Sequence, residues 1–168
     1  MNAQLSAFDL DVYHTVDAPP AEYEQDFYAW TQHQAMLLRD GDWTALDVAN
    51  LIEELETMGR SERRELANRL EQLLLHLLKW QYQPVRRSKS WRASIRYQRL
   101  GIARLLDDNP SLRGMIPVLL ENVYASAVLR AEIETNLAAT MFPTVCPYTI
   151  DQMLDIAWLP ESESGAEI

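Results

Sequence analysis

Apolar residues recur at helical spacing along most of the chain, and the clearest stripe lies between residues 44 and 83. Its members follow at steps of four, three, four and three: Leu66, Leu70, Leu73, Leu77 and Trp80. At ~3.6 residues per turn these positions share one narrow face, which is typical of a packed helical seam. Further leucines between Leu74 and Leu78 extend the apolar surface around most of the circumference. We expect this end to lie in the middle of a bundle or at a subunit contact.

The residues just before this stripe predict a second helical pattern, formed by Val48, Leu51, Ile52, Leu55 and Met58. Thr44 and Asp47 have the spacing of a capping box, with aspartate in place of the usual glutamate or glutamine. Gly59 follows the last periodic residue, and Ser61 can cap what comes next. Two helices joined by a tight turn are therefore predicted. One long helix kinked at Gly59 is the alternative.

The same periodicity predicts helices on both sides of this region. A first helix spans about Ala21 to Arg39, stops at Gly41, and turns Tyr23, Phe27, Trp30, Leu37 and Leu38 inward. Another helix, capped by Ser90, runs to about Asp107. A further one follows Asn109 and Pro110 and continues to about Leu137, and Pro117 either kinks it or starts it late. Thr149 and Gln152 have capping-box spacing and open a short helix.

Glycine is scarce and alternating runs are short, which argues against a sheet. The sequence therefore predicts an all-α fold, a helical bundle of four main helices with short accessory helices. Residues 1–20 are predicted to form a flexible leader, residues 21–160 a single helical domain and residues 161–168 an acidic tail.

The N-terminal residues lack the basic and apolar regions of a secretory signal, and Cys146 is the only cysteine. No uninterrupted apolar run is long enough to cross a bilayer. We therefore expect a cytoplasmic protein with no internal disulfide and no membrane partner.

Charge is unevenly distributed along the chain. Residues 79–104, here called the basic segment, carry +8 and no acid, which leaves −18 for the rest of a chain whose net charge is −10. An overall negative charge disfavours a nucleic-acid partner. This local concentration of positive charge nevertheless requires an explanation.

The basic segment has two interpretations. Arginines interleaved with aromatic residues suit phosphate contact and base stacking. The candidate residues for binding an anion or nucleic acid are Arg86, Arg87, Lys89, Arg92, Arg96, Arg99 and Trp91. The favoured interpretation is intramolecular, with these cations paired to Glu53, Glu54, Glu56 or Glu65 on neighbouring helices. Arginine suits both carboxylate and phosphate, so residue type does not decide between them.

Candidate catalytic chemistry is sparse. Four residues are conceivable metal ligands from facing helices: Glu53, Glu56, His76 and Glu121. They lack the Glu-x-x-His spacing of such sites, and we expect no metal and no cofactor. Cys146 lies one residue before Pro147, where a small buried apolar role outweighs that of a nucleophile. No glycine-rich phosphate loop or serine nucleophile elbow is present.

Several strings, in order, carry a family resemblance: Tyr23-Glu24 with Asp26-Phe27 and Trp30, Asn50 through Glu56, His76 through Lys79, Ser90-Trp91, Asn109 through Leu112, and Phe142-Pro143 with Cys146-Pro147. Over residues 22–160 the chain resembles the bacterial domain of unknown function 29 family. The resemblance implies an all-helical fold. It implies no activity and no catalytic residues.

Three functional hypotheses follow. The leading one is a non-enzymatic helical interaction module that binds a protein partner or itself, motivated by the crowded leucines between Leu74 and Leu78. The second is binding of nucleic acid or another polyanion by the basic segment. The third is a metal-dependent enzyme, for which the sequence offers the least support.

Overall fold

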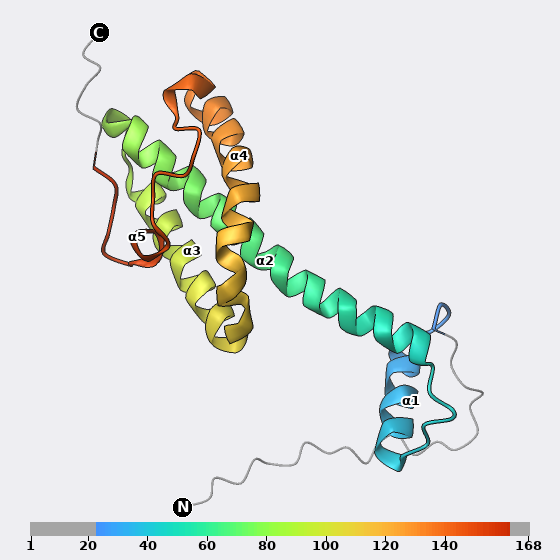
Figure 1. Cartoon of the computed structure of the whole chain (residues 1–168). Helices are drawn as coiled ribbons and strands as arrows, with labels where there is room; N and C mark the ends of the chain where they lie inside the picture. The colour runs from blue at the N-terminus through green and yellow to red at the C-terminus, as the bar shows by residue number, and fades with distance from the viewer. Residues whose placement is uncertain (1–22, 162–168) are drawn as a thin grey trace, which may run out of the picture. The chain divides into compact units, whose positions relative to one another are not determined.

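The computed structural model describes residues 23–161, and these residues contain no β-strand (Figure 1). Their helices are α1 (Phe27–Asp40), α2 (Val48–Tyr82), α3 (Lys89–Asp108), α4 (Ile116–Thr135) and the short α5 (Ile150–Leu154). The predicted all-α fold with four main helices is therefore confirmed.

The chain divides into two compact units, which are described separately. The first unit ends at Glu56 and the second begins at Thr57, so the boundary falls within α2. The assignment of residues 21–160 to a single domain stays a prediction. The predicted leader, 1–20, lies outside the described residues, as does the predicted tail except for its first residue, Glu161.

In the first unit, α1 begins later than predicted. The side chain of Asp26 accepts a hydrogen bond from the backbone N–H of Ala29 at 3.0 Å and so caps the helix immediately before Phe27. The helix ends as predicted at Gly41, whose φ of 73° is the left-handed conformation that glycine adopts without strain.

Two of the residues predicted to turn inward from the first helix are buried, Trp30 and Leu37. Phe27 and Leu38 are exposed, so that part of the prediction was wrong. Helical spacing places a residue on a face, but whether a neighbour covers that face depends on contacts distant in sequence.

The region around Gly59 also differs from the prediction. α2 is one helix of 35 residues that continues through Gly59, so the two-helix prediction was wrong. Glycine costs about 1 kcal/mol relative to alanine in a helix interior, and the glutamate, leucine and arginine residues around it offset that cost. Asp47, not Thr44, caps the helix: its Oδ1 accepts from the backbone N–H of Asn50 at 3.3 Å. The Thr44 hydroxyl instead donates to Asp42.

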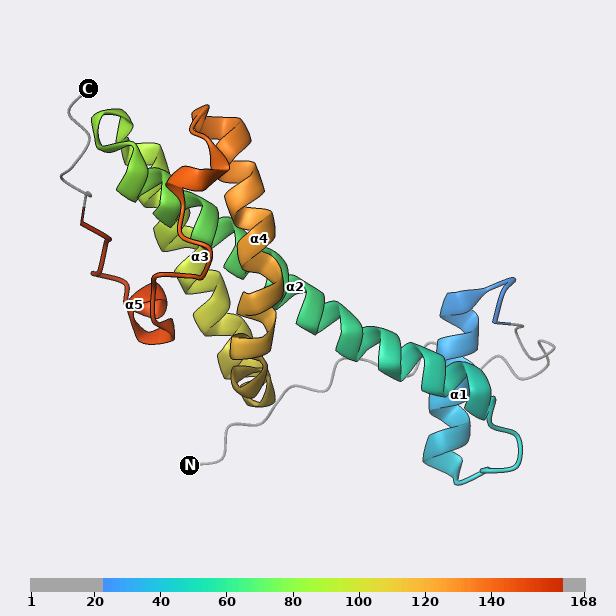
Figure 2. The ribbon, with the colours of Figure 1, turned by 45° about the horizontal axis from the view of Figure 1, so that its top comes forward.

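The core of the second unit is built on the second half of α2. Seven leucines there are buried: Leu66, Leu70, Leu73, Leu74, Leu75, Leu77 and Leu78. Further core side chains come from α3 and α4, chiefly Ile95, Ile102, Leu106, Leu119 and Val123. In both ribbon views α3 and α4 lie beside this half of α2 (Figures 1 and 2). The crowded leucines thus lie in the middle of the unit's own bundle, and they are not available to a second subunit.

Local signals in the second unit mostly agree with the prediction. Ser88, rather than Ser90, caps α3. Pro117 lies in the first turn of α4, so it starts the helix late and does not kink it. The predicted capping box of Thr149 and Gln152 is present at the start of α5.

One segment of the described chain, Pro110–Thr135, is long and apolar enough to cross a membrane by length and composition alone. The sequence analysis did not identify this segment because it considered only uninterrupted runs of apolar residues. A helix that supplies core residues passes the same test, and α4 buries Leu119, Leu120 and Val123 within the second unit.

The core assignment can be tested by Leu70→Ala or Leu73→Ala. Each leaves a cavity among fully buried side chains, so each should lower the free energy of unfolding by ~2–5 kcal/mol in urea denaturation. Leu129→Ala is the matched control, since Leu129 in the same unit is 57% exposed. Equal losses of unfolding free energy in the core and control variants would contradict the assignment of Leu70 and Leu73 to the core.

Candidate functional site

The basic segment divides into cations used by the fold and cations that face solvent. Lys79, Arg87 and Arg99 contact other parts of the second unit. The exposed members are Arg86, Lys89, Arg92, Arg96 and Arg104. No ion pair joins any of these five to a carboxylate within residues 23–161. Intramolecular contacts therefore explain only some of the positive charges of the basic segment.

Arg99 is the most deeply buried arginine of the segment, at 3% exposure. Its Nε donates to the carbonyl oxygen of Met153 at 2.6 Å, and its Nη1 donates to that of Trp158 at 2.8 Å. Nη2 lies 3.3 Å from the carbonyl oxygen of Gln152. Burial lowers the pKa of Arg99, an effect that the charge of Asp155 opposes. The guanidinium thus fastens the segment around and after α5 to α3.

Lys79 is paired inside the second unit, but not with a predicted partner. Its Nζ lies 2.5 Å from Glu134 Oε2 and 4.7 Å from the centre of the Trp91 ring. Burial raises the pKa of Glu134, but the hydrogen bond and charge of Lys79 outweigh it, so the net shift is downward. Glu65, one of the predicted partners, pairs with Arg69 at 2.7 Å. Trp91 is half-buried beneath this lysine, which limits its use as a base-stacking platform.

Arg87 is also held within the unit. Its Nε donates to the Trp80 carbonyl oxygen at 2.8 Å, and its guanidinium carbon lies 5.1 Å from the centre of the Trp80 ring. Its position therefore depends on the end of α2.

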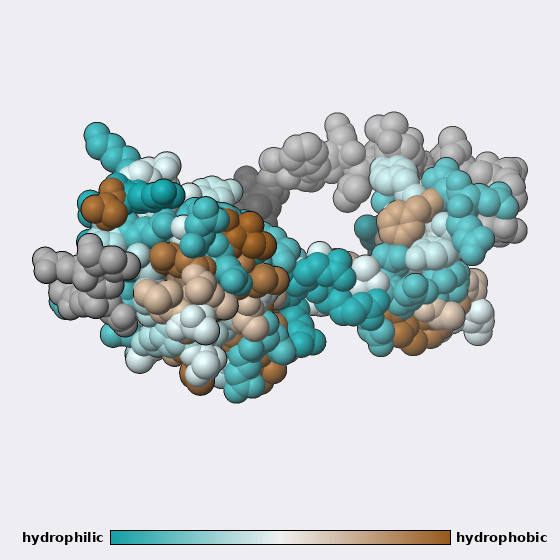
Figure 3. Space-filling view, turned by 90° about the horizontal axis from the view of Figure 1, so that it is seen from above, coloured by the Kyte–Doolittle hydropathy of each residue, from teal (hydrophilic) through white to brown (hydrophobic). Residues whose placement is uncertain are grey.

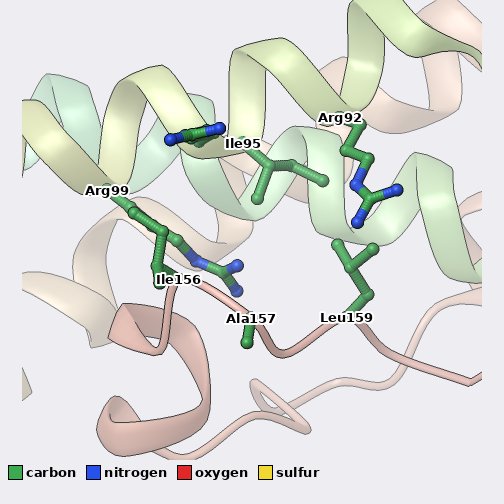
Figure 4. A pocket seen from close by; sticks show the side chains of 7 residues that line it. Arg92, Ile95, Arg99, Ile156, Ala157 and Leu159 are labelled. Atoms are coloured by element: carbon green, nitrogen blue, oxygen red, sulfur yellow. The ribbon is translucent and has the colours of Figure 1, made fainter.

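Arg92 and Arg96 lie on the same face of α3 as Ile95 and Arg99, since positions three, four and seven apart share a helix face. This face lines a cavity of about 300 Å³. The opposite wall is the segment after α5, with Ile156, Ala157 and Leu159. Figure 4 shows Arg92 and Arg99 extending from α3 toward this wall. The sequence analysis missed the wall residues because they begin about 60 positions after Ile95 and carry no motif.

The candidate metal ligands are not brought together. Glu53 and Glu56 belong to the first unit, whereas His76 and Glu121 belong to the second. His76 Nδ1 lies 2.8 Å from the carbonyl oxygen of Gln72, and burial lowers the pKa of His76. Within the part of the chain that the structure describes, no three His, Cys, Asp or Glu side chains form a group that could hold a metal ion.

Cys146 is half-buried, and its thiol donates to the carbonyl oxygen of Tyr148 at 3.6 Å. Burial raises the pKa of the thiol. A raised pKa disfavours the thiolate that nucleophilic chemistry requires.

Sequence reasoning also missed a polar network in the first unit. Asp47 Oδ2 accepts from Trp30 Nε1 at 3.2 Å and from Asn50 Nδ2 at 2.7 Å, and the Asn50 side chain contributes most to lowering the pKa of Asp47. The hydroxyl of Tyr23 donates to Glu54, and this bond is the main reason that the pKa of Tyr23 is raised to about 12. These contacts fix the start of α2 against α1.

The first half of α2 carries an exposed apolar stripe, here called the α2 stripe: Val48, Ile52, Leu55 and Met58. These side chains are between 52% and 67% exposed. The sequence predicts the helical pattern of these residues correctly, but the structure leaves this face exposed, unlike that of the second half of the helix. Periodicity shows that a face is apolar, but not that another element covers it. Apolar residues are visible on the surface of the first unit in Figure 3.

The fold and these surfaces define an all-α protein with an uncovered apolar helix face and a group of solvent-facing arginines. Residues 22–159 match the family model described as Domain of unknown function DUF29, and the chain belongs to this family. The resemblance seen in the sequence is thereby confirmed. Comparison with curated proteins and with solved structures gave no match. The family description names no activity, so the functional argument rests on the surfaces described above.

The role of Arg99 can be tested by Arg99→Lys. Lysine keeps the charge but lacks the planar fork of Arg99, whose three nitrogens reach three carbonyl groups, so the free energy of unfolding should fall by about 2 kcal/mol, the scale of hydrogen bonds to charged groups. Arg104→Lys, at an exposed position of the same helix, should change it by less than about 0.5 kcal/mol. Indistinguishable urea curves for the two variants would contradict the structural role.

Proposed function

We propose that this protein is a non-enzymatic interaction module that pairs with a second copy of itself through α2. The observation that carries the proposal is the exposed α2 stripe. Four large apolar side chains at helical spacing remain accessible there, although the second half of the same helix buries seven leucines. Burying such a face removes apolar area from water, which is the main driving force of protein association.

Charge order along α2 favours a copy of the same chain as the partner. The charged residues just before Gly59 are all acidic, and arginines outnumber acids just after it: Glu53, Glu54 and Glu56 precede it, and Arg60, Arg63 and Arg64 follow it with Glu62 and Glu65. In an antiparallel pair with its two-fold axis near Gly59, the acidic part of each helix lies against the basic part of its copy. Leu55 and Met58, which lie nearest the axis, then form the apolar contact, whereas Val48 and Ile52 lie against residues of the copy that follow Arg63. A two-fold interface must be self-complementary in this way. At ~100° per residue, Glu53, Glu56, Arg60 and Arg63 fall on one side of the stripe, where they flank the apolar contact.

Gly59 supports the same arrangement. It lies inside a helix, where glycine lowers stability, and apart from its chain neighbours and the backbone of its own helix no described atom lies within 4 Å of the position that a Cβ would occupy. A glycine on this face lets a second helix approach closely. Packing among residues 23–161 does not account for this glycine, and close contact with a second α2 would.

Polyanion binding is the second candidate, favoured by the five exposed cations of the basic segment. Two features weaken its nucleic-acid form. Lys79, Arg87 and Arg99 are occupied within the fold, and Trp91 lies against Lys79. The remaining cations suit a smaller anion better than a stacked strand of bases.

Self-association is tested by sedimentation velocity over a concentration series with the whole chain. The native protein should form a dimer at micromolar concentration, whereas Leu55→Glu should remain monomeric because it places a charge in the apolar contact. Leu129→Glu, at an exposed leucine of the second unit, is the matched control and should dimerise normally. Circular dichroism should show unchanged helix content in both variants. A monomeric native protein, or equal effects of the two substitutions, would refute the proposal.

The charge pairing is tested by two complementary variants. The four charged residues that flank the apolar contact are Glu53, Glu56, Arg60 and Arg63. Replacing both glutamates by arginine makes all four basic, and replacing both arginines by glutamate makes all four acidic. Each variant alone should dimerise more weakly than the native chain, and an equimolar mixture should form heterodimers. Failure of the mixture to associate would contradict the pairing.

A further inference from the structure

We propose that the cavity between α3 and the segment after α5 binds a small organic carboxylate with an apolar body. Its lining combines two solvent-facing guanidinium groups, those of Arg92 and Arg96, with the apolar side chains of Ile95, Ile156 and Leu159. Figure 4 shows the guanidinium group of Arg92 close to Leu159. This proposal concerns the second unit alone and is independent of self-association through α2.

The arginines supply the anion-binding half of the site. Arg92 and Arg96 are one helical turn apart, and like charges at this spacing disfavour a helix. No carboxylate of residues 23–161 forms an ion pair with either of them. Two guanidinium forks on one face match the two oxygens of a carboxylate, which would relieve their repulsion.

The apolar half distinguishes this site from a general basic surface. Ile95 is buried, whereas Ile156 is 53% exposed. Leu159 is half-buried on the same wall. A ligand with an uncharged hydrocarbon body would cover this surface while its carboxylate meets the arginines. The volume of about 300 Å³ is at the lower end of the range for small-molecule pockets, so the ligand is small.

Arg99 makes the cavity a preformed one. Its guanidinium holds the carbonyl group of Met153, which precedes the wall residues, and that of Trp158, which lies between Ala157 and Leu159. Because the wall is already held in place, it loses little conformational entropy when a ligand enters, and such preorganisation favours binding. Arg99 is therefore a positioning residue, and Arg92 and Arg96 are the ligand-binding residues.

The test is isothermal titration calorimetry of the full chain with octanoate. Acetate, which lacks the apolar body, and octanol, which lacks the charge, are titrated in parallel. Octanoate should bind at least about tenfold more tightly than either, because each half of the ligand contributes separately. Absence of octanoate binding, or equal binding of octanol, would overturn the proposal.

Matched double variants locate the site. Arg92→Ala with Arg96→Ala should lower octanoate affinity by at least about tenfold, since it removes charge-assisted hydrogen bonds. Arg86→Ala with Arg104→Ala removes the same charge outside the cavity and should leave the affinity unchanged. Equal losses in both variants would indicate general electrostatic attraction and contradict the cavity. Tight binding of single-stranded RNA that is weakened equally by both variants, with octanoate inert, would identify a nucleic-acid surface and would also overturn it.

Discussion

Burial of the leucine face in the second half of α2 is the interaction on which the fold of the second unit depends. Each leucine side chain contributes roughly 1.5–3 kcal/mol when it is fully removed from water, and seven are buried there. α3 and α4 pack on this face, and Arg99 then ties the C-terminal segment to α3 through backbone carbonyl groups. The cavity beside Arg92 exists because that segment is held in place. The second unit is thus built outward from one helix face.

The cations illustrate how burial separates structural roles from binding roles. A buried charge is costly unless it is hydrogen-bonded or paired. Lys79 meets this requirement with Glu134 and Arg99 meets it with carbonyl oxygens. Arg92 and Arg96 remain exposed without a carboxylate partner in the described chain, and they are the residues on which ligand binding is proposed.

The sequence predicted the features that depend on residues close together in the chain. The stripe of leucines, the stop at Gly41 and the capping box at Thr149 each depend on neighbouring residues only, and each is present. The continuity of α2 through Gly59 was missed because a glycine cost of about 1 kcal/mol is easily outweighed by the surrounding helix formers. The partners of Lys79 and the far wall of the cavity depend on residues distant along the chain, which periodicity does not pair.

The central claim is that two copies pair through antiparallel α2 helices near Gly59, and cross-linking tests it most directly. In a Cys146→Ser background, Met58→Cys places a thiol close to its own copy across the two-fold axis. Oxidation should then give a covalent dimer in high yield, whereas Leu129→Cys in the same background should give little. A Met58→Cys chain that stays monomeric, or that cross-links no better than Leu129→Cys, would contradict the account.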